Sequence, residues 1–560
     1  MAEIKLRIPD PFIIDGYYES CPKPITLQEL KLLSLEAAIR LKKDWTTKIF
    51  DESIVAKWRI EYHSQQDETI DDSYFDYAIA ECRYQAESSS DGILMSPVDG
   101  VFQADGIVPQ DILGDLLESV MDLENSKFKD WHPGSNEQVL DLVHPSLYPY
   151  VYGVSRQLPK EDNRKLAWNE LFGRGEILQF TYKFDYSHSD KFQWLLSEFV
   201  IDPVTGAVQI DSYINNLHPE EHESLYATLE KVFSKFVPMF EILLTRLVNP
   251  IKLRLKPPAY KWSHKYVYSY RMTNVDFEEE ESDEDDDEED DEEDDDDEDD
   301  YRNNERIRPD LKPGAFKPPN LPKNVFSLKG KRLQAIVKLS NIHLTPEKPR
   351  YPGGVWHVEG MRNERIVASG IYYYDMENIT ESRLRFRQAV ATPTEFGGEA
   401  DMPASSDDNG NLHIWCNHFY GLGNGSYWNQ ELGYVCAEPG RLIVFPNVFQ
   451  HKVEPFELVD KTKPGHRKIL VFFLVDPNIS ILSTERVPPQ QNSWLFKEVC
   501  KIVPQIAMLP DLVKKRIQEL LPMTLDEAKI FREELMKERK YYIRESGSKI
   551  FQRPFSLCEH

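Results

Sequence analysis

The sequence predicts an α+β protein whose C-terminal half is a β-sandwich or jelly roll, with a largely helical N-terminal region and C-terminal helices. Three observations lead to this prediction. Apolar residues in the first half recur at helical spacing. After residue 323, short β-rich runs alternate with turns marked by Pro and Gly, as in sandwiches and jelly rolls. Beyond residue 490 the helical spacing returns.

Residues 1–170 are expected to form a mainly helical region. Thr26-Leu-Gln-Glu29 has the capping-box pattern of a helix start, and leucines follow it at helical spacing as far as Leu41. Further helices are predicted in the same region at about 51–63, 70–87 and 111–123.

Residues 171–270 are predicted to mix strands with one long helix and to pack on the core. Apolar and polar residues alternate over 178–184, which is typical of a strand. The run 199–210 predicts two strands around a Pro/Gly turn. The segment 219–248 carries an apolar stripe and predicts a long amphipathic helix.

The negative charge of the chain is concentrated in one tract. The formal net charge is −29, and between Asp276 and Asp300 all but Phe277 and Ser282 of the 25 residues are Asp or Glu. Subtracting these 23 charges from −29 leaves −6, so the rest of the chain is only mildly acidic. Like charges at this density repel and cannot be buried, so we expect 271–322, the tract with its basic and Pro-rich flank, to be a disordered insertion.

Two roles for the acidic tract stay open. It is either a solubilising insertion or a site that attracts basic protein partners such as histones or ribosomal proteins through charge complementarity. Direct nucleic-acid binding is not expected, because the tract would repel phosphates.

Residues 323–490 are predicted to form the β-rich core, and residues 491–560 a helical extension. Strands are expected over 333–344, 366–374, 382–388, 441–445 and 469–475. Helices are expected over 494–502, 511–520 and 524–541, the last with a second capping box, Thr524-Leu-Asp-Glu527.

Cysteine usage and hydropathy suggest a cytoplasmic or nuclear protein. The six cysteines are scattered without Cys-x-x-Cys spacing, which argues against both a zinc cluster and a disulfide framework. The N-terminus has no apolar stretch typical of a secretory signal. No window approaches the ~18 apolar residues of a membrane span, so no membrane association is expected.

The most informative motif is His357-Val-Glu359, which lies between two predicted strands. Residues i and i+2 of an extended segment point to the same face, so both side chains can approach one metal ion. A later strand, Arg441–Phe445, ends in a Phe-Pro step and is followed by His451. Two histidines and one carboxylate are the facial set that holds non-haem Fe(II) with open coordination positions. Sixteen residues after His451, Arg467 opens an apolar strand, where it can bind a carboxylate in a bidentate manner.

The order of these elements resembles the double-stranded β-helix of the Fe(II)/2-oxoglutarate-dependent dioxygenases. The resemblance implies that His357, Glu359 and His451 bind the iron and that Arg467 holds the distal carboxylate of 2-oxoglutarate. Glu359 departs from the Asp that is usual in the prolyl-hydroxylase-like branch, although the JmjC branch commonly uses Glu.

Three further residues are candidates for co-substrate binding. Asn341, on the preceding strand, is a candidate for reaching the 2-oxoglutarate carboxylate. Alternation places Tyr372 and Tyr374 on one face of the next strand and Tyr373 on the other. One of these faces should line the pocket, and packing in the core is an equally good interpretation for each tyrosine.

Longer runs resemble a family described only as domain of unknown function 4246, which is widespread in fungi. The resemblance lies in the runs that begin at Trp131, Ser212, Trp356, Tyr372 and Phe445. It implies one large protein with an oxygenase-like core, and it implies no substrate.

We therefore expect an oxygenase that uses Fe(II), O₂ and 2-oxoglutarate to hydroxylate an unidentified substrate. The alternative from another class is a non-catalytic scaffold whose acidic tract recruits basic partners. A third interpretation is a cupin-like isomerase or hydrolase that uses the same three ligands without 2-oxoglutarate.

Other motifs have ordinary interpretations beside functional ones. His188-Ser-Asp190 resembles the metal motif but lacks a matching later histidine, and a surface turn is favoured. Arg383, Arg385 and Arg387 share one strand face, which is either solvated or the lip of a site for an anionic substrate. His413 and His418 are candidates for a substrate lid, and His466 is expected to be structural.

Overall fold

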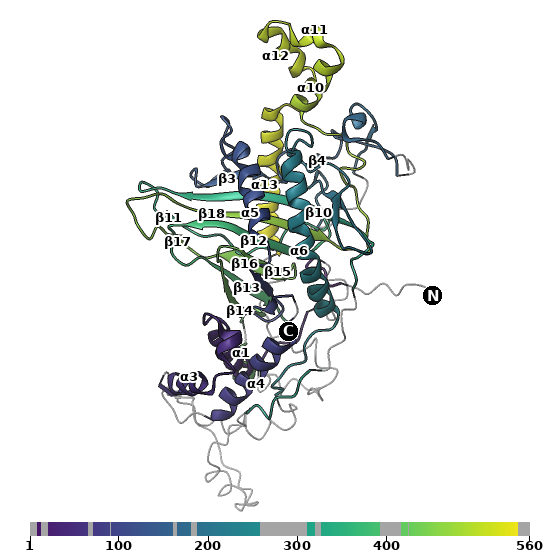
Figure 1. Cartoon of the computed structure of the whole chain (residues 1–560). Coiled ribbons are helices and arrows are strands. Elements are labelled where there is room, and N and C mark those ends of the chain that lie inside the picture. The colour runs from purple at the N-terminus through teal and green to yellow at the C-terminus, as the bar shows by residue number, and fades with distance from the viewer. Residues whose placement is uncertain are drawn as a thin grey trace, which may run out of the picture.

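The computed structural model describes residues 8–12, 21–64, 71–89, 91–160, 165–180, 187–257, 311–319, 326–391, 416–423 and 425–546. Mixed helix and sheet is confirmed, with a large antiparallel sheet at the centre and helices around it (Figure 1). The acidic tract and part of the predicted strand 178–184 lie outside the described residues.

The large sheet collects strands from distant parts of the chain. Its order is β1 (Ile93–Met95), β2 (Phe102–Asp105), β15 (Arg441–Pro446), β12 (Ile366–Glu377), β18 (Gly465–Val475), β10 (Arg332–Leu344), β8 (Ser197–Ile201) and β9 (Val208–Ile210). β3 (Val139–Val143) also pairs with β10, beyond the segment that β8 occupies. Strands from both sides of the acidic tract therefore belong to one sheet.

A smaller sheet faces the large one. Its strands are β14 (Asn429–Cys436), β13 (Arg383–Ala389) and β16 (Phe449–Val453), in that order. Beside β16, a bridge between His357 and His451 adds the preceding loop as a further extended segment. Apolar side chains from both sheets, among them Phe386, Phe445 and Phe473, fill the space between them.

Two helices cover the other face of the large sheet. α5 (Gln110–Glu124) and α6 (Glu223–Val248) pack against each other, and α6 lies on β12 and β15 (Figure 1). The stripe predicted on the long helix is buried in this core, with Leu229, Phe233 and Phe236 fully covered. α6 approaches β12 closely at Gly370, because a glycine has no Cβ to meet the helix.

The N-terminal helices form a satellite core of their own. They are α1 (Leu27–Arg40), α2 (Trp45–Lys48), α3 (Glu52–Ser64) and α4 (Asp72–Ser88). Thr26 caps α1 by accepting a hydrogen bond from Glu29 N at 3.1 Å. The Glu29 carboxylate does not complete the box and instead accepts from Leu255 N at 3.0 Å.

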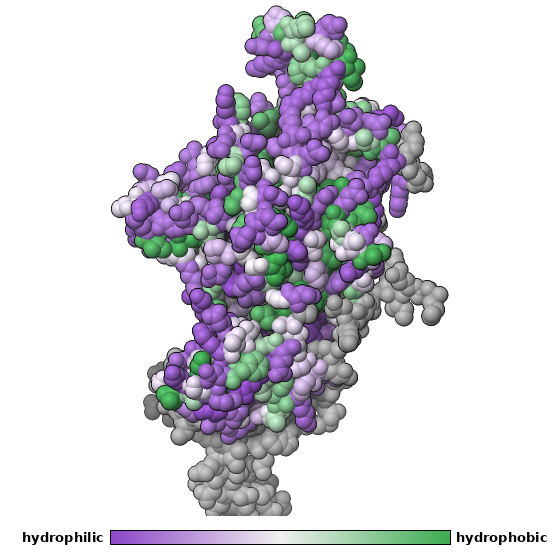
Figure 2. Space-filling model, in the orientation of Figure 1, coloured by the Kyte–Doolittle hydropathy of each residue, from purple (hydrophilic) through white to green (hydrophobic). Residues whose placement is uncertain are grey.

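The C-terminal helices have two different environments. α10 (Asn492–Ile502), α11 (Pro504–Ala507) and α12 (Asp511–Glu519) project from the body (Figure 1). Apolar side chains gather on this projection in Figure 2, where Ile502, Met508 and Leu512 are about four-fifths exposed. α13 (Leu525–Ser546) instead returns to the body and packs on the core between the sheets. The second capping box is confirmed, since Thr524 and Glu527 bond each other's backbone N–H.

Most of the predicted helices and strands are confirmed, with ends shifted by a few residues. The strand predicted over 178–184 is not: residues 178–180, its described part, form no strand, and the nearest strand ends at Ile177. The described part also contains short elements, among them β4 (Tyr150–Val151) with β7 (Phe192–Gln193), β5 (Arg156–Gln157) with β6 (Glu176–Ile177), β11 (Arg350–Tyr351) with β17 (Phe456–Glu457), and a 3₁₀ helix at Trp168–Leu171. Among the described helices, none is both long and apolar enough to cross a bilayer.

Candidate metal centre and its cavity

Backbone pairing brings the three predicted metal ligands together. His357 N donates to His451 O at 3.2 Å, and His451 N donates to His357 O at 2.9 Å. Because residues directly opposite in such a pair project to the same side, the two imidazoles lie beside each other, with ring centroids 4.3 Å apart. Glu359, two residues beyond His357, points to the same face.

The ligand atoms of this triad converge. Glu359 Oε1 lies 3.2 Å from His451 Nε2 and 3.6 Å from His357 Nε2, and one ligand atom from each residue falls within 4.8 Å of the others. The His357 and Glu359 side chains are 31% and 16% exposed, so the cluster opens to one side, while His451 is buried.

Asn447 fixes the backbone of the carboxylate ligand. Its side chain accepts from Glu359 N at 2.8 Å and donates to Glu359 O at 3.0 Å, and it also donates to Ile366 O. Asn447 has no solvent exposure. The sequence analysis did not identify this residue, although it directly follows the Phe-Pro step that marked the strand.

The charges of the triad are coupled. Burial alone would raise the pKa of Glu359, but the hydrogen bonds and charges of the two histidines outweigh it and hold that pKa well below its usual range. Burial tends to lower the pKa of His357, yet Glu359 raises it overall. Burial and the neighbouring His357 lower the pKa of His451. The electrostatics of the triad therefore favour an ionised Glu359 between the two imidazoles.

The donor set fits a divalent transition metal. His357 Nδ1 donates to Val355 O at 2.8 Å, which leaves the Nε2 lone pair directed at the cluster. A backbone carbonyl holding the outer nitrogen is the usual arrangement around a metal-binding histidine. Two imidazoles and one carboxylate suit Fe(II), and other first-row metals bind the same set.

Arg467 is a buried cation with no carboxylate partner in the described part of the chain. It is 4% exposed, donates from Nη1 to Ser382 Oγ at 2.8 Å, and stacks on Tyr373 and Phe456. Its Nε has no hydrogen-bond partner among the described residues, and burial lowers its pKa. Such a group fits an anionic ligand, because an uncompensated buried charge is costly.

The three residues predicted to contact the co-substrate do not face the triad: they are Asn341, Tyr372 and Tyr374. All three face the α5/α6 core, on the side of the large sheet away from the triad. Tyr374 Oη donates to Asn341 Oδ1 at 3.1 Å, and Asn341 Nδ2 donates to Glu124 of α5 at 2.7 Å. The expected co-substrate contacts are therefore not formed. Alternation groups residues by face, but it does not say which face of the sheet a helix covers.

A cavity of about 650 Å³ opens beside the triad. One wall carries His357, Glu359 and Gln450, and α13 forms another with residues that include Met536, Arg539 and Tyr542. Its described lining does not include Arg467. The volume lies within the range of small-molecule sites.

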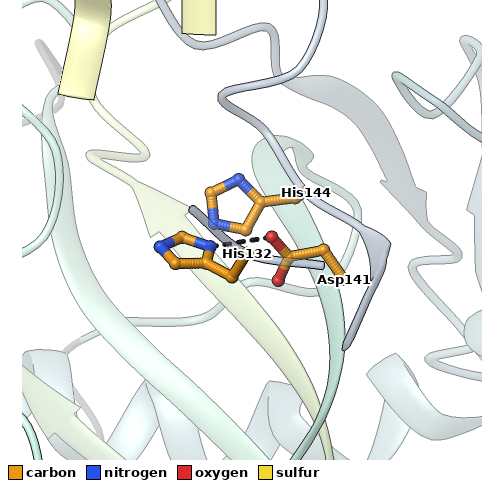
Figure 3. A group of neighbouring side chains, drawn as sticks. All are labelled: His132, Asp141 and His144. Atoms are coloured by element: carbon orange, nitrogen blue, oxygen red, sulfur yellow. Dashed lines mark hydrogen bonds and ion pairs between the residues drawn. The ribbon is translucent and has the colours of Figure 1, made fainter. Parts of the chain in front are cut away.

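A second group of polar residues borders the same cavity through His132 and His144, which belong to its lining. His132, Asp141 and His144 come together around β3 (Figure 3), and one potential ligand atom from each lies within 4.8 Å of the others. From the sequence alone, this stretch was noted only for the family resemblance of the run that begins at Trp131. The signal that could have drawn attention to it is the Asp141-Leu-Val-His144 spacing next to His132.

The remaining sequence candidates take no part in the triad. Arg385 pairs with Glu431 and Glu454, and Arg387 donates to Gln450 at 2.7 Å, on the outer face of the small sheet. His466 bonds Asp375 at 2.8 Å. His188 and His418 do not line the cavity, and His413 lies outside the described residues.

The comparisons with known families decide where this chain belongs. The family described as "Protein of unknown function (DUF4246)" matches residues 72–498, and the N-terminal domain of the same family matches residues 11–61. The chain belongs to this family. The resemblance inferred from the sequence is thereby confirmed at the level of the family, and no curated protein matches the chain.

Solved structures show only distant similarity. A crystal structure of IDO from Bacillus thuringiensis is 8% identical, with a TM-score of 0.27, over 67% of this chain and 89% of that one. A bsmA homologue from Methylobium petroleophilum PM1 is 13% identical over 26% of this chain and 42% of that one, with a TM-score of 0.15. The Fe(II)/(alpha)ketoglutarate-dependent dioxygenase TqaL is 12% identical over 29% and 47%, with a TM-score of 0.16.

Proposed function

We propose that this protein is a non-haem Fe(II)/2-oxoglutarate-dependent oxygenase that hydroxylates a substrate bound in the cavity. The observation that carries the proposal is the convergence of His357, Glu359 and His451 at the edge of that cavity. In this proposal the two facing sheets are a double-stranded β-helix, in which β10, β18, β12 and β15 form one layer and β14, β13 and β16 the other.

The three ligand residues would hold Fe(II), and Arg467 would hold the distal carboxylate of 2-oxoglutarate. The chemistry that iron and 2-oxoglutarate supply together is the insertion of one oxygen atom of O₂ into a substrate C–H bond, while the keto acid loses CO₂ and becomes succinate. The chain contributes geometry to this reaction. Asn447 and the Val355 carbonyl fix the orientation of Glu359 and His357, and Phe386 and Phe445 exclude water behind His451.

The metal assignment is tested by loading the full chain with Fe(II) without oxygen and measuring bound metal. We expect one ion per chain, and affinity at least about 100-fold lower in His451→Ala, because loss of a ligand should cost no less than loss of a supporting residue. His466→Ala, which removes a histidine that bonds Asp375 and lies outside the triad, is the matched control. Equal metal affinity in all three proteins would refute the assignment.

The co-substrate assignment has a separate test. Arg467→Met should leave metal binding intact but weaken 2-oxoglutarate binding at least about tenfold, the equivalent of ~1.4 kcal/mol. Unchanged 2-oxoglutarate affinity in this variant would assign the anchor to another residue. Metal-dependent turnover with no need for 2-oxoglutarate would favour the cupin-like isomerase or hydrolase.

The scaffold alternative depends on the acidic tract, which lies outside the described residues. It predicts that the chain binds neither iron nor 2-oxoglutarate and that deletion of 276–300 abolishes capture of basic proteins. The proposed oxygenase instead keeps metal binding after this deletion. The proposed location stays the cytoplasm or nucleus, on the cysteine pattern of the sequence.

A further inference from the structure

The second cluster differs from the triad in how its hydrogen bonds are arranged. His132 and His144 flank Asp141, whose side chain is 1% exposed and also accepts from Ser340 Oγ at 3.3 Å (Figure 3). Residue types alone would allow a second metal site here. The direction of the hydrogen bonds argues for a different role.

His144 cannot offer a lone pair to a metal inside the cluster. Ser146 N donates to His144 Nδ1 at 3.2 Å, so the proton of the neutral ring must sit on Nε2. Burial keeps this imidazole neutral, since it lowers the pKa of His144 to about 3. His357 has the opposite arrangement, because its Nδ1 donates to a carbonyl and leaves Nε2 free as a ligand.

His132 is left with a hydrogen-bond acceptor that faces the cavity. Its Nδ1 lies 2.8 Å from Asp141 Oδ2, and an ionised carboxylate there requires Nδ1 to carry the proton. Burial opposes ionisation of Asp141, but interactions with its neighbours, including the hydrogen bond to His132, outweigh it and lower the pKa of that carboxyl. The His132 side chain is 27% exposed and lines the cavity, and its Nε2 has no partner within the described part of the chain.

We propose that His132, oriented by Asp141, positions the substrate by accepting a hydrogen bond from a hydroxyl or amine of a small molecule with an apolar body. The apolar body is suited to the remaining lining, which includes Pro133, Trp194, Val355, Leu535 and Met536. A few placed polar groups among apolar side chains are typical of small-molecule sites, and this volume is sufficient for one. The inference rests on the proposed function for the reaction, but the binding itself needs no metal.

The test compares two isomers that differ in one hydrogen-bond donor. Butan-1-ol and 1-methoxypropane have the same formula, and only the alcohol can donate to His132 Nε2. Binding is followed on the metal-free full chain by NMR of ¹⁵N-labelled histidine. We expect the alcohol to bind about fivefold more tightly and to shift the His132 Nε2 resonance, since one neutral hydrogen bond has roughly this net value. Equal binding of the isomers, or no binding of either, would overturn the proposal.

Two variants separate the acceptor from its orientation. His132→Phe removes the acceptor, and Asp141→Asn favours the tautomer with the proton on Nε2, so each should bind both isomers equally. If a variant fails to fold, the comparison of the two isomers on the wild-type chain still tests the proposal. Titration with Zn²⁺ supplies the opposite outcome: a second ion per chain that is lost in His132→Phe would show a metal site instead. Because the isomers are tested without metal, failure here leaves the iron assignment intact, and failure of iron binding leaves this test valid.

Discussion

At the scale of single residues, hydrogen-bond direction separates two clusters of the same composition. Both contain two histidines and one carboxylate, and both border one cavity. In one cluster a carbonyl fixes the outer nitrogen of His357, while in the other a backbone N–H occupies the Nδ1 of His144. In our two proposals, the same residue types therefore serve metal binding in one place and substrate binding in the other.

His144 should make the stability of the protein depend on pH. Its pKa is about 3 in the folded chain, against 6.5 for an ordinary histidine, mainly because it is buried, with Lys338, His132 and Arg532 adding to the effect and Asp141 opposing it. The unfolded chain therefore takes up a proton below pH 6.5 that the folded chain refuses, so stability is lost as pH falls from 6.5 toward 3. Between pH 7 and pH 5 this costs about 2 kcal/mol.

Urea unfolding at pH 7 and pH 5 measures this effect. The wild type should lose about 2 kcal/mol more than His144→Gln over this interval. His63→Gln, which removes an exposed histidine of α3, is the control for a change of residue type alone. The same loss in wild type and His144→Gln would mean that His144 is protonated in the folded protein.

At the scale of elements, one glycine sets how closely α6 lies on the large sheet. A Cβ at Gly370 would lie 2.7 Å from Phe236 Cδ1 and 3.0 Å from Phe240 Cζ, both on α6. These phenylalanines are fully buried and cannot move aside. Gly370→Ala should therefore destabilise the protein by about 1–3 kcal/mol through overpacking.

Gly114→Ala is a matched control for this substitution. Gly114 lies inside α5, and a Cβ there meets no atom within 4 Å. The same change should stabilise the protein by about 0.5–1 kcal/mol, because alanine loses less backbone entropy in a helix. Thermal unfolding of both variants checks the pair, and a melting temperature raised in both would contradict the close contact.

The elements themselves were largely predictable, because they depend on local patterns. Thr524 and Glu527 form the predicted capping box from residues three apart. At the first capping box only the Thr26 hydrogen bond forms, because the Glu29 carboxylate accepts a hydrogen bond from the distant backbone N–H of Leu255 instead. Local rules predict where a helix begins, but they cannot account for a partner more than 200 residues away.

The candidate site was predictable only in part for the same reason. His357 and Glu359 share a face by alternation, and the Phe-Pro step indicated a strand before His451. The face on which Tyr372 and Tyr374 lie depends on α6 covering one side of the sheet. The cluster at His132 depends on β3 pairing with β10, and no sequence period encodes that pairing.

At the scale of the whole molecule, the cavity exists because three distant parts of the chain meet. The segments around His132 and His357 supply polar groups, and α13 closes the cavity from the C-terminal end. Arg539 on α13 donates to the fully buried Glu364 at 2.6 Å and lies over Trp194, 3.8 Å from its ring centroid. Because Trp194 also lines the cavity, this contact ties the closing helix to the cavity wall.

Removal of Arg539 should weaken the attachment of α13 to the wall of the cavity. Glu364 would keep hydrogen bonds from Met361 N and Trp194 N, but its charge would lose the only ion-pair partner that it has in the described part of the chain. Breaking a buried pair in this way costs about 3–5 kcal/mol. Arg539→Ala should therefore speed amide exchange across α13, whereas Arg516→Ala on the exposed α12 should change stability by less than about 1 kcal/mol.

Arg539→Lys separates charge from shape, since lysine keeps the charge but not the planar fork, and we expect only partial protection of α13. If α13 stays as protected in Arg539→Ala as in the wild type, apolar packing on the core between the sheets is sufficient to hold the helix, and the cavity is closed without this ion pair.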